Sequence, residues 1–147
     1  MSFSIHAIPA EAADQLRRTS GAASAEWVAT GGEPVRCCLR DATAGERLLL
    51  VNYEPPLPPS PYRETGAVFV HAEPCAGPAD GGYPADWRRR PQVLRAYDER
   101  GWIHPASTAH DGSDPEAVLA QVLATPGVVE VHSRNIAYGC YMFTATA

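Results

Sequence analysis

The sequence contains no lysine, and all twelve basic residues are arginines. A Schiff base to a carbonyl substrate or to pyridoxal phosphate needs a lysine amine, and a P-loop needs a lysine for its phosphates. Both kinds of site are therefore excluded. The motifs GxGxxG, GxSxG and HExxH are also absent, which argues against the familiar dinucleotide, hydrolase and zinc-protease sites. We accordingly expect no organic cofactor.

Long apolar runs are missing as well. No run approaches the ~20 residues that a membrane-spanning helix needs, and the N-terminus lacks the basic and apolar regions of a signal peptide. The cysteines form no CxxC pair, and in an extended chain the neighbours Cys37 and Cys38 point apart. We therefore expect a cytoplasmic protein with reduced thiols, no disulfide framework and no membrane partner.

The bulk composition is that of an ordinary globular protein. The 147 residues are 45% hydrophobic and 20% charged, with a formal net charge of -5. This length predicts one domain over residues 1–147, with a core of useful size. The acidic balance disfavours nucleic acid as a partner, because phosphate binding needs a basic surface.

Local patterns predict an α+β fold. Helices are expected at residues 10–18 and after Asp114, whose side chain would cap the helix ahead of Pro115. The apolar run in residues 47–53 predicts a strand that is buried on both faces. Weaker patterns predict strands at residues 3–8, 35–39, 67–71, 93–97, 102–103, 128–133 and 138–144. We expect a largely antiparallel sheet of about six strands, with two main helices on one face.

The remaining segments are predicted to be connections. Residues 55–61 hold five prolines and should form a stiff extended loop. Residues 73–86 are rich in glycine and proline and are also expected to form a loop. For residues 19–33 we expect an irregular connection, with a short helix near Trp27 as the alternative.

Candidate site residues gather in two blocks, at 60–71 and 131–140, each of which holds an arginine, a histidine, a tyrosine and a glycine. On a strand, His132 and Arg134 share one face. The planar donor fork of Arg134 and the tunable imidazole of His132 could then engage one anionic group, with Asn135 at the strand end. The alternative is an edge hairpin whose polar face meets water.

The first block offers Tyr62 and Arg63 at the junction between a loop and a strand. Arg63 could bind a carboxylate or phosphate, and Tyr62 could supply a hydroxyl group. The alternative is that Arg63 pairs with a surface carboxylate such as Glu54 or Glu64, while Tyr62 packs over the core. His71 is expected on a strand face beside apolar side chains, where a satisfied, partly buried histidine is the more common outcome.

Cysteine chemistry needs a thiolate and a nearby base. Cys140 and His132 could meet this need across a hairpin, although an inert buried cysteine is the more common case. A metal site could be imagined from His71, His132, Cys75 and Cys140. Zinc ligands usually occur in close pairs along the chain, and no such pair is present, so we expect no metal site.

Several motifs together resemble the bacterial domain of unknown function 1203 family. In chain order they are residues 36–42 (RCCLRDA), 45–50 (GERLLL), 60–66 (SPYRETG), 69–71 (FVH), 94–98 (LRAYD), 131–135 (VHSRN) and 139–140 (GC). The likeness runs from Val35 to Phe143. It implies a small stand-alone bacterial protein, and it implies no activity because the family is named for lacking one.

The sequence departs from the family pattern at two places. Members commonly read Gly-Pro-Ile-Phe-Val where this chain has residues 66–70 (GAVFV), and Pro-Cys-Arg where it has residues 34–36 (PVR). A site that depends on the cysteine of the second motif would lack it here.

Three functions follow from these residues as hypotheses. In the first, a cofactor-independent enzyme acts on a small anionic or polar metabolite. Its catalytic residues would be His132, Cys140 and Tyr62, and its substrate-binding residues would be Arg63, Arg134, Asn135 and His71. In the second, the same arginines serve a non-catalytic module that binds a small ligand or a protein. In the third, the protein has a structural role as a homodimer through an exposed sheet edge.

Overall fold

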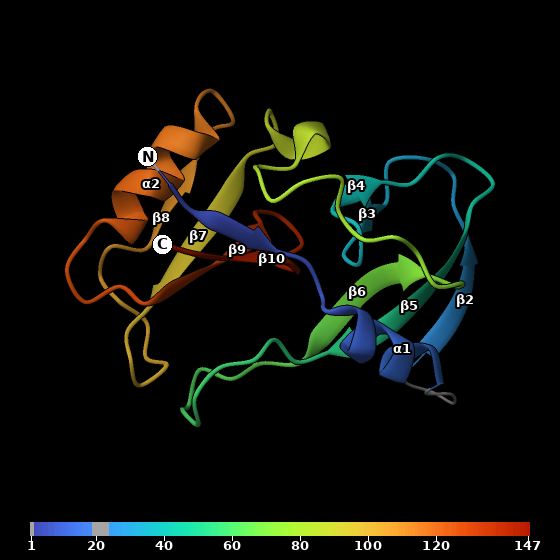
Figure 1. Cartoon of the computed structure of the whole chain (residues 1–147), viewed down its shortest axis with the longest axis horizontal. Helices are drawn as coiled ribbons and strands as arrows, with labels where there is room; N and C mark the ends of the chain where they lie inside the picture. Colours follow the sequence, from blue (N-terminus) through green and yellow to red (C-terminus); the bar gives the residue numbers. More distant parts are fainter. Residues whose placement is uncertain (1, 19–23) are drawn as a thin grey trace.

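The computed structural model describes residues 2–18 and 24–147, and its strands form two five-stranded sheets that lie side by side (Figure 1). Sheet A has the strand order β1-β10-β9-β7-β8, and its pairings are antiparallel. Its strands are β1 (Ser4–His6), β7 (Gln92–Tyr97), β8 (Thr108–His110), β9 (Glu130–Asn135) and β10 (Tyr141–Thr146).

Sheet B has the strand order β2-β5-β6-β3-β4. The pairing of β3 with β6 is parallel, and the others are antiparallel. Its strands are β2 (Ser24–Val28), β3 (Pro34–Val35), β4 (Arg40–Asp41), β5 (Arg47–Tyr53) and β6 (Gly66–His71).

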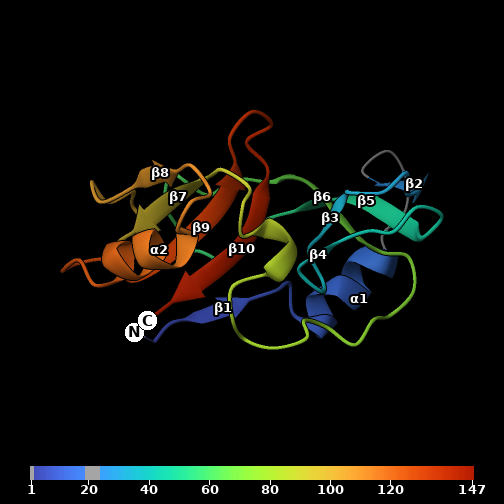
Figure 2. The same cartoon turned by 90° about the horizontal axis from the view of Figure 1, so that it is seen from above.

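Each sheet has its own helix and its own apolar core. Helix α1 (Ala10–Arg18) lies against β5 of sheet B, whereas α2 (Pro115–Leu123) lies against β7 and β9 of sheet A. A short 3-10 helix, η1 (Ala85–Trp87), adds Trp87 to the core of sheet A. Both chain ends lie at sheet A (Figure 2), because β1 pairs with β10. Within the described residues, neither helix is long and apolar enough to cross a membrane.

The strongest local predictions are confirmed. Helix α1 covers residues 10–18 and β5 covers residues 47–53, as the sequence patterns predict. Helix α2 begins directly after Asp114, whose Oδ1 accepts a hydrogen bond from the backbone N–H of Ala117 at 3.2 Å. The two helices depend on contacts between near neighbours in the chain, and the apolar run of β5 lies in one short segment, so a sequence pattern records them directly. The expected burial of both faces of β5 is only partly met, since Leu49 and Leu50 are half-buried and Asn52 is exposed.

The predicted single sheet of about six strands with both helices on one face is wrong. The strands divide between two sheets, and each helix packs on a different one. Strand β2 replaces the irregular connection or short helix that was expected near Trp27, and it pairs along its whole length with β5. Hydrogen bonds to a distant strand override a weak local pattern here. Residues 19–23 of that predicted connection lie outside the described residues.

The strand predicted at residues 35–39 is also corrected. Strand β3 ends at Val35, and the chain then turns, with the N–H of Leu39 donating to the carbonyl of Val35 at 2.9 Å. Leu39 has a φ of 57°, a left-handed conformation that is rare for a residue with a side chain. Cys37 and Cys38 therefore do not lie in an extended chain, and the expectation that they point apart fails.

Candidate functional site

A cleft of about 1420 Å³ has walls from both sheets. Sheet B contributes parts of β2, β5 and β6, and sheet A contributes parts of β7, β9 and β10. Its charged lining residues are the arginines Arg36, Arg90, Arg95 and Arg134 and the glutamates Glu33 and Glu64. Positive charge thus exceeds negative charge in the cleft, although the chain as a whole has a net charge of -5.

Arg36 connects the two sheets at the base of this cleft. Its side chain is buried, and the whole residue is only 1% exposed. Its guanidinium donates to the carbonyl of Tyr141 at 2.7 Å, to the carbonyl of Pro34, and to Sγ of Cys140 at 3.1 Å. Burial lowers the pKa of the Arg36 guanidinium, and the neighbouring Cys140 opposes this shift.

Cys140 lies at the end of the hairpin that joins β9 to β10. The N–H of Asn135 donates to the carbonyl of Cys140 at 2.9 Å, and the Asn135 side-chain amide donates to the Cys140 Sγ at 3.1 Å. Together with Arg36, this gives the sulfur two N–H donors. Cationic and N–H donor groups around sulfur are typical of reactive cysteines.

Two other arginines of the cleft, Arg95 and Arg134, form ion pairs with the side chain of Glu64. Glu64, from the segment before β6, pairs with Arg95 of β7 and with Arg134 of β9. Two guanidinium nitrogens of Arg134 lie 3.4 and 3.5 Å from the carboxylate oxygens of Glu64. The Nε–H of Arg134 donates to the Gly139 carbonyl at 2.8 Å. Although burial favours the neutral acid, Arg95 and Arg134 hold the pKa of Glu64 below its usual value. The Glu64 side chain is 48% exposed, so it lies at the cleft surface.

Glu33 also lines the cleft, and its carboxylate is bound by the neighbouring backbone. Its carboxylate accepts hydrogen bonds from the N–H groups of Thr30 and Gly31 at 2.8 and 2.9 Å, and from Nε1 of Trp27 at 2.9 Å. The Thr30 bond, with smaller contributions from Trp27 and Gly31, lowers the pKa of Glu33 to about 2 despite its burial. An ionised Glu33 therefore holds the connection between β2 and β3.

The predicted site residues do not form one site, and only three of the seven line the cleft. Arg134, Asn135 and Cys140 line the cleft together. His132 is buried at 2% exposure, with its ring against Tyr97 and Tyr141 and its Nε2 3.1 Å from a Glu130 carboxylate oxygen. It belongs to the packing of sheet A, and the described lining of the cleft contains no histidine.

The predicted residues of the first block, Tyr62, Arg63 and His71, are not in the described lining of the cleft. Arg63 pairs with the surface carboxylate of Glu54, which is the alternative that the sequence left open. Tyr62 packs edge-on against Trp102, with ring centroids 5.6 Å apart. Arg36, Arg95 and Glu64 were not predicted as site residues, because nothing in the local sequence indicates that they face the same space.

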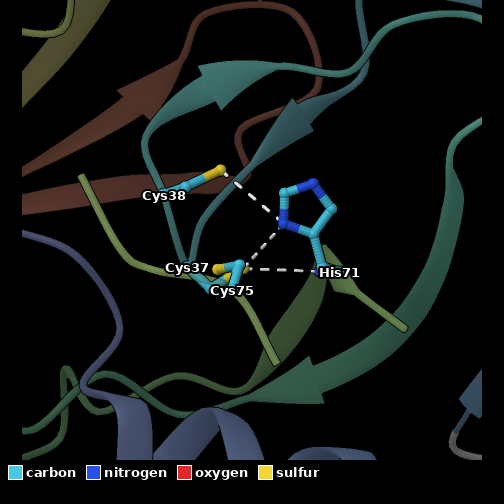
Figure 3. Close-up of side chains that lie close together, drawn as sticks. All are labelled: Cys37, Cys38, His71 and Cys75. Atoms are coloured by element: carbon cyan, nitrogen blue, oxygen red, sulfur yellow. Dashed lines mark hydrogen bonds between the residues drawn. The ribbon is translucent and has the colours of Figure 1, made fainter. Parts of the chain in front are cut away.

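His71 lies in another group, at the far end of β6. Its Nδ1 is 3.5 Å from Cys37 Sγ and 3.8 Å from Cys38 Sγ (Figure 3). Cys75 Sγ lies 3.1 Å from Cys37 Sγ. The expectation of no metal site was based on the lack of close ligand pairs along the chain, but among the described residues this group has the ligand types and spacing to hold a metal ion.

Comparison with known proteins places the chain in a family. A family model described as protein of unknown function (DUF1203) matches residues 32–146, which include the cleft arginines and the cysteine-histidine group. No curated protein and no solved structure gives a match. Since the matched segment covers most of the 147 residues, the chain belongs to the DUF1203 family.

Proposed function

We propose that the cleft between the sheets binds a small organic anion through Arg95 and Arg134. The observation that carries this proposal is the contact of both arginines with the Glu64 carboxylate. A guanidinium group binds carboxylate and phosphate oxygens with the same donor geometry. Glu64 therefore marks where the acidic group of a ligand would lie, and its exposed side chain can leave that place.

The rim of the cleft supports an organic ligand over a bare inorganic ion. Ile136 and Tyr138 line the cleft from the β9–β10 hairpin, and the Tyr138 residue is 91% exposed. Apolar and aromatic surface beside a few polar groups is typical of sites for small organic molecules. The ligand class that fits is a mono- or dicarboxylate, or a phosphate monoester, with an apolar part.

The test is calorimetric titration of the purified chain with a panel of carboxylates and phosphate monoesters. Arg134→Gln should weaken binding by about 10- to 100-fold, because it removes charge-assisted hydrogen bonds. Arg63→Gln is the matched control, since Arg63 pairs with Glu54 outside the cleft lining, and it should bind as the wild type does.

Glu64 provides a test of opposite sign. If its carboxylate occupies the ligand position, Glu64→Gln removes a competing anion and binding becomes tighter, whereas Glu54→Gln leaves the affinity unchanged. Weaker binding by Glu64→Gln, or equal losses in Arg134→Gln and Arg63→Gln, would contradict the proposal. So would the absence of binding by every member of the panel.

The two N–H donors at Cys140 favour a second function, in which the Cys140 sulfur attacks the acyl carbon of a bound ester that carries the anionic group. A C–S bond forms as the ester C–O bond breaks, the alcohol leaves with a proton, and water then hydrolyses the thioester. This reading needs turnover as well as binding. Cys140→Ser should then keep the affinity for the anion and lose the reaction. Binding by the wild type without any turnover, together with alkylation of Cys140 no faster than that of a free thiol, would leave the cleft as a non-catalytic binding site.

A further inference from the structure

Four potential metal ligands converge at the end of β6 in sheet B, and none of them is in the described lining of the cleft. They are the sulfurs of Cys37, Cys38 and Cys75 and a ring nitrogen of His71, and all of these atoms lie within 4.8 Å of one another. Figure 3 shows the three cysteine side chains around one side of the imidazole ring. Cys37 and Cys38 come from the turn after β3, His71 ends β6 and Cys75 lies in the loop after it, so two distant chain segments meet here.

The spacing of these atoms agrees with a tetrahedral zinc site. Zinc lies about 2.3 Å from a thiolate sulfur and about 2.0 Å from an imidazole nitrogen, so a tetrahedron places sulfur and nitrogen about 3.6 Å apart and two sulfurs about 3.8 Å apart. The distances from His71 Nδ1 to Cys37 Sγ and Cys38 Sγ are 3.5 and 3.8 Å. The Cys37–Cys75 sulfur distance of 3.1 Å is shorter, so a bound ion would need the Cys75 sulfur to move outward by less than about 1 Å.

The second ring nitrogen of His71, Nε2, contacts a carboxylate, as it does in many metal-bound histidines. His71 Nε2 lies 3.0 Å from the Glu46 carboxylate, and a carboxylate that receives the second N–H of a ligating histidine is a regular feature of zinc sites. Arg40 is also 3.3 Å from this nitrogen, but its main partners are the two Glu46 oxygens, at 2.9 and 3.0 Å. With its proton on Nε2, His71 presents the lone pair of Nδ1 to the sulfurs.

The surrounding backbone supports the same geometry. The N–H of His71 donates to Cys37 Sγ at 3.4 Å, and Arg17 of α1 donates to the carbonyl of His71 at 2.9 Å. The left-handed conformation of Leu39 closes the turn in which both Cys37 and Cys38 lie. A disulfide does not account for the arrangement, because it would join two sulfurs at about 2.05 Å and leave His71 Nδ1 and the other sulfur without a role.

We propose that Cys37, Cys38, Cys75 and His71 Nδ1 together bind one Zn²⁺ ion. Three thiolates and one neutral imidazole form a closed set of four protein ligands, which is the composition of structural zinc sites. The ion would fasten the turn after β3 to the end of β6 and to the loop that follows. Arg36 immediately precedes Cys37, so the same turn also directs the arginine that reaches Cys140 in the cleft.

The experiment measures metal in the full chain, purified under reducing conditions and then offered zinc. We expect one zinc per chain by elemental analysis. Substitution with Co²⁺ should give the absorption bands of a tetrahedral thiolate site. Cys75→Ser should lower the zinc affinity by at least about 100-fold, whereas Cys140→Ser, the matched control at the cysteine outside the group, should keep both the stoichiometry and the spectrum.

If Cys75→Ser fails to fold, it gives no information about zinc binding. The wild type is therefore also tested with a chelator. Removal of zinc should lower its Tm by about 10 °C, because a tightly bound ion stabilises the folded state, and added zinc should restore it. The proposal is overturned if the wild type takes up no stoichiometric zinc, if the cobalt form lacks thiolate bands, or if thiol counting finds a Cys37–Cys75 disulfide instead. Anion binding is measured separately, so failure here leaves the cleft proposal intact.

Discussion

Arg36→Met tests whether one buried cation holds the two sheets together. The guanidinium of Arg36 joins Pro34 of sheet B to Tyr141 of sheet A and also donates to Cys140. Methionine can occupy a similar volume without strain, so the variant removes the hydrogen bonds without opening a large cavity. Because the Arg36 residue is only 1% exposed, water cannot replace the lost donors.

The expected change in the free energy of unfolding is the difference between opposing contributions. A hydrogen bond from a charged donor contributes about 1.5–3 kcal/mol, and leaving a buried acceptor unpaired costs about 1–3 kcal/mol. The variant gains back several kcal/mol because it no longer buries a charge. With two carbonyl oxygens and one sulfur deprived of their donor, we expect a net loss of about 3 kcal/mol in the free energy of unfolding, or about 6–12 °C in Tm.

Urea denaturation followed by tryptophan fluorescence measures this loss. The matched control is Arg47→Met, because Arg47 is exposed and its ion pair with Glu73 is long, at 3.9 Å. Exposed pairs of this kind contribute at most about 1 kcal/mol. If Arg36→Met is within about 0.5 kcal/mol of the control, which is the usual range for surface changes, Arg36 does not join the sheets as described. A second readout is alkylation of Cys140, which should slow when its cationic donor is removed.

Two further predictions concern single residues. Glu33 has a pKa of about 2, below the 4.5 that is usual for a glutamate, so its ionised form stabilises the fold fully above pH 4.5 and this contribution disappears as the pH falls toward 2. Glu33→Gln should therefore be less stable than the wild type at pH 6, and the difference in urea midpoint should shrink as the pH falls toward 2; a constant difference would refute the assignment. Gly112 has a φ of +86°, and an added Cβ would clash with the carbonyl group of Arg89. In thermal denaturation Gly112→Ala should lose clearly more than the about 1–2 kcal/mol that a left-handed conformation costs, whereas Gly45→Ala, with a φ of +93° and open space around it, should lose only that amount.

Elements that depend on short-range chemistry were predictable. Helix α2 has its Asp114 cap and its proline within one turn, and β5 has a continuous apolar run. Strand β2 was missed because it is an edge strand with mostly exposed side chains, so its pattern carries little signal and its pairing with β5 decides its conformation. The division into two sheets was missed for the same reason, since strand pairing is a contact between distant segments.

The sequence by itself determined the chemistry that this protein can use: arginine without lysine, four cysteines, and Arg134, Asn135 and Cys140 close enough along one hairpin to share a site. Only the tertiary structure decided which distant groups join them. It brought Arg36 to Cys140 and Glu64 to Arg95, it placed His132 in the packing of sheet A, and it gathered Cys37, Cys38 and Cys75 around His71. The physical reason is that turns and sheet pairing set the directions of these side chains, and those depend on the whole chain.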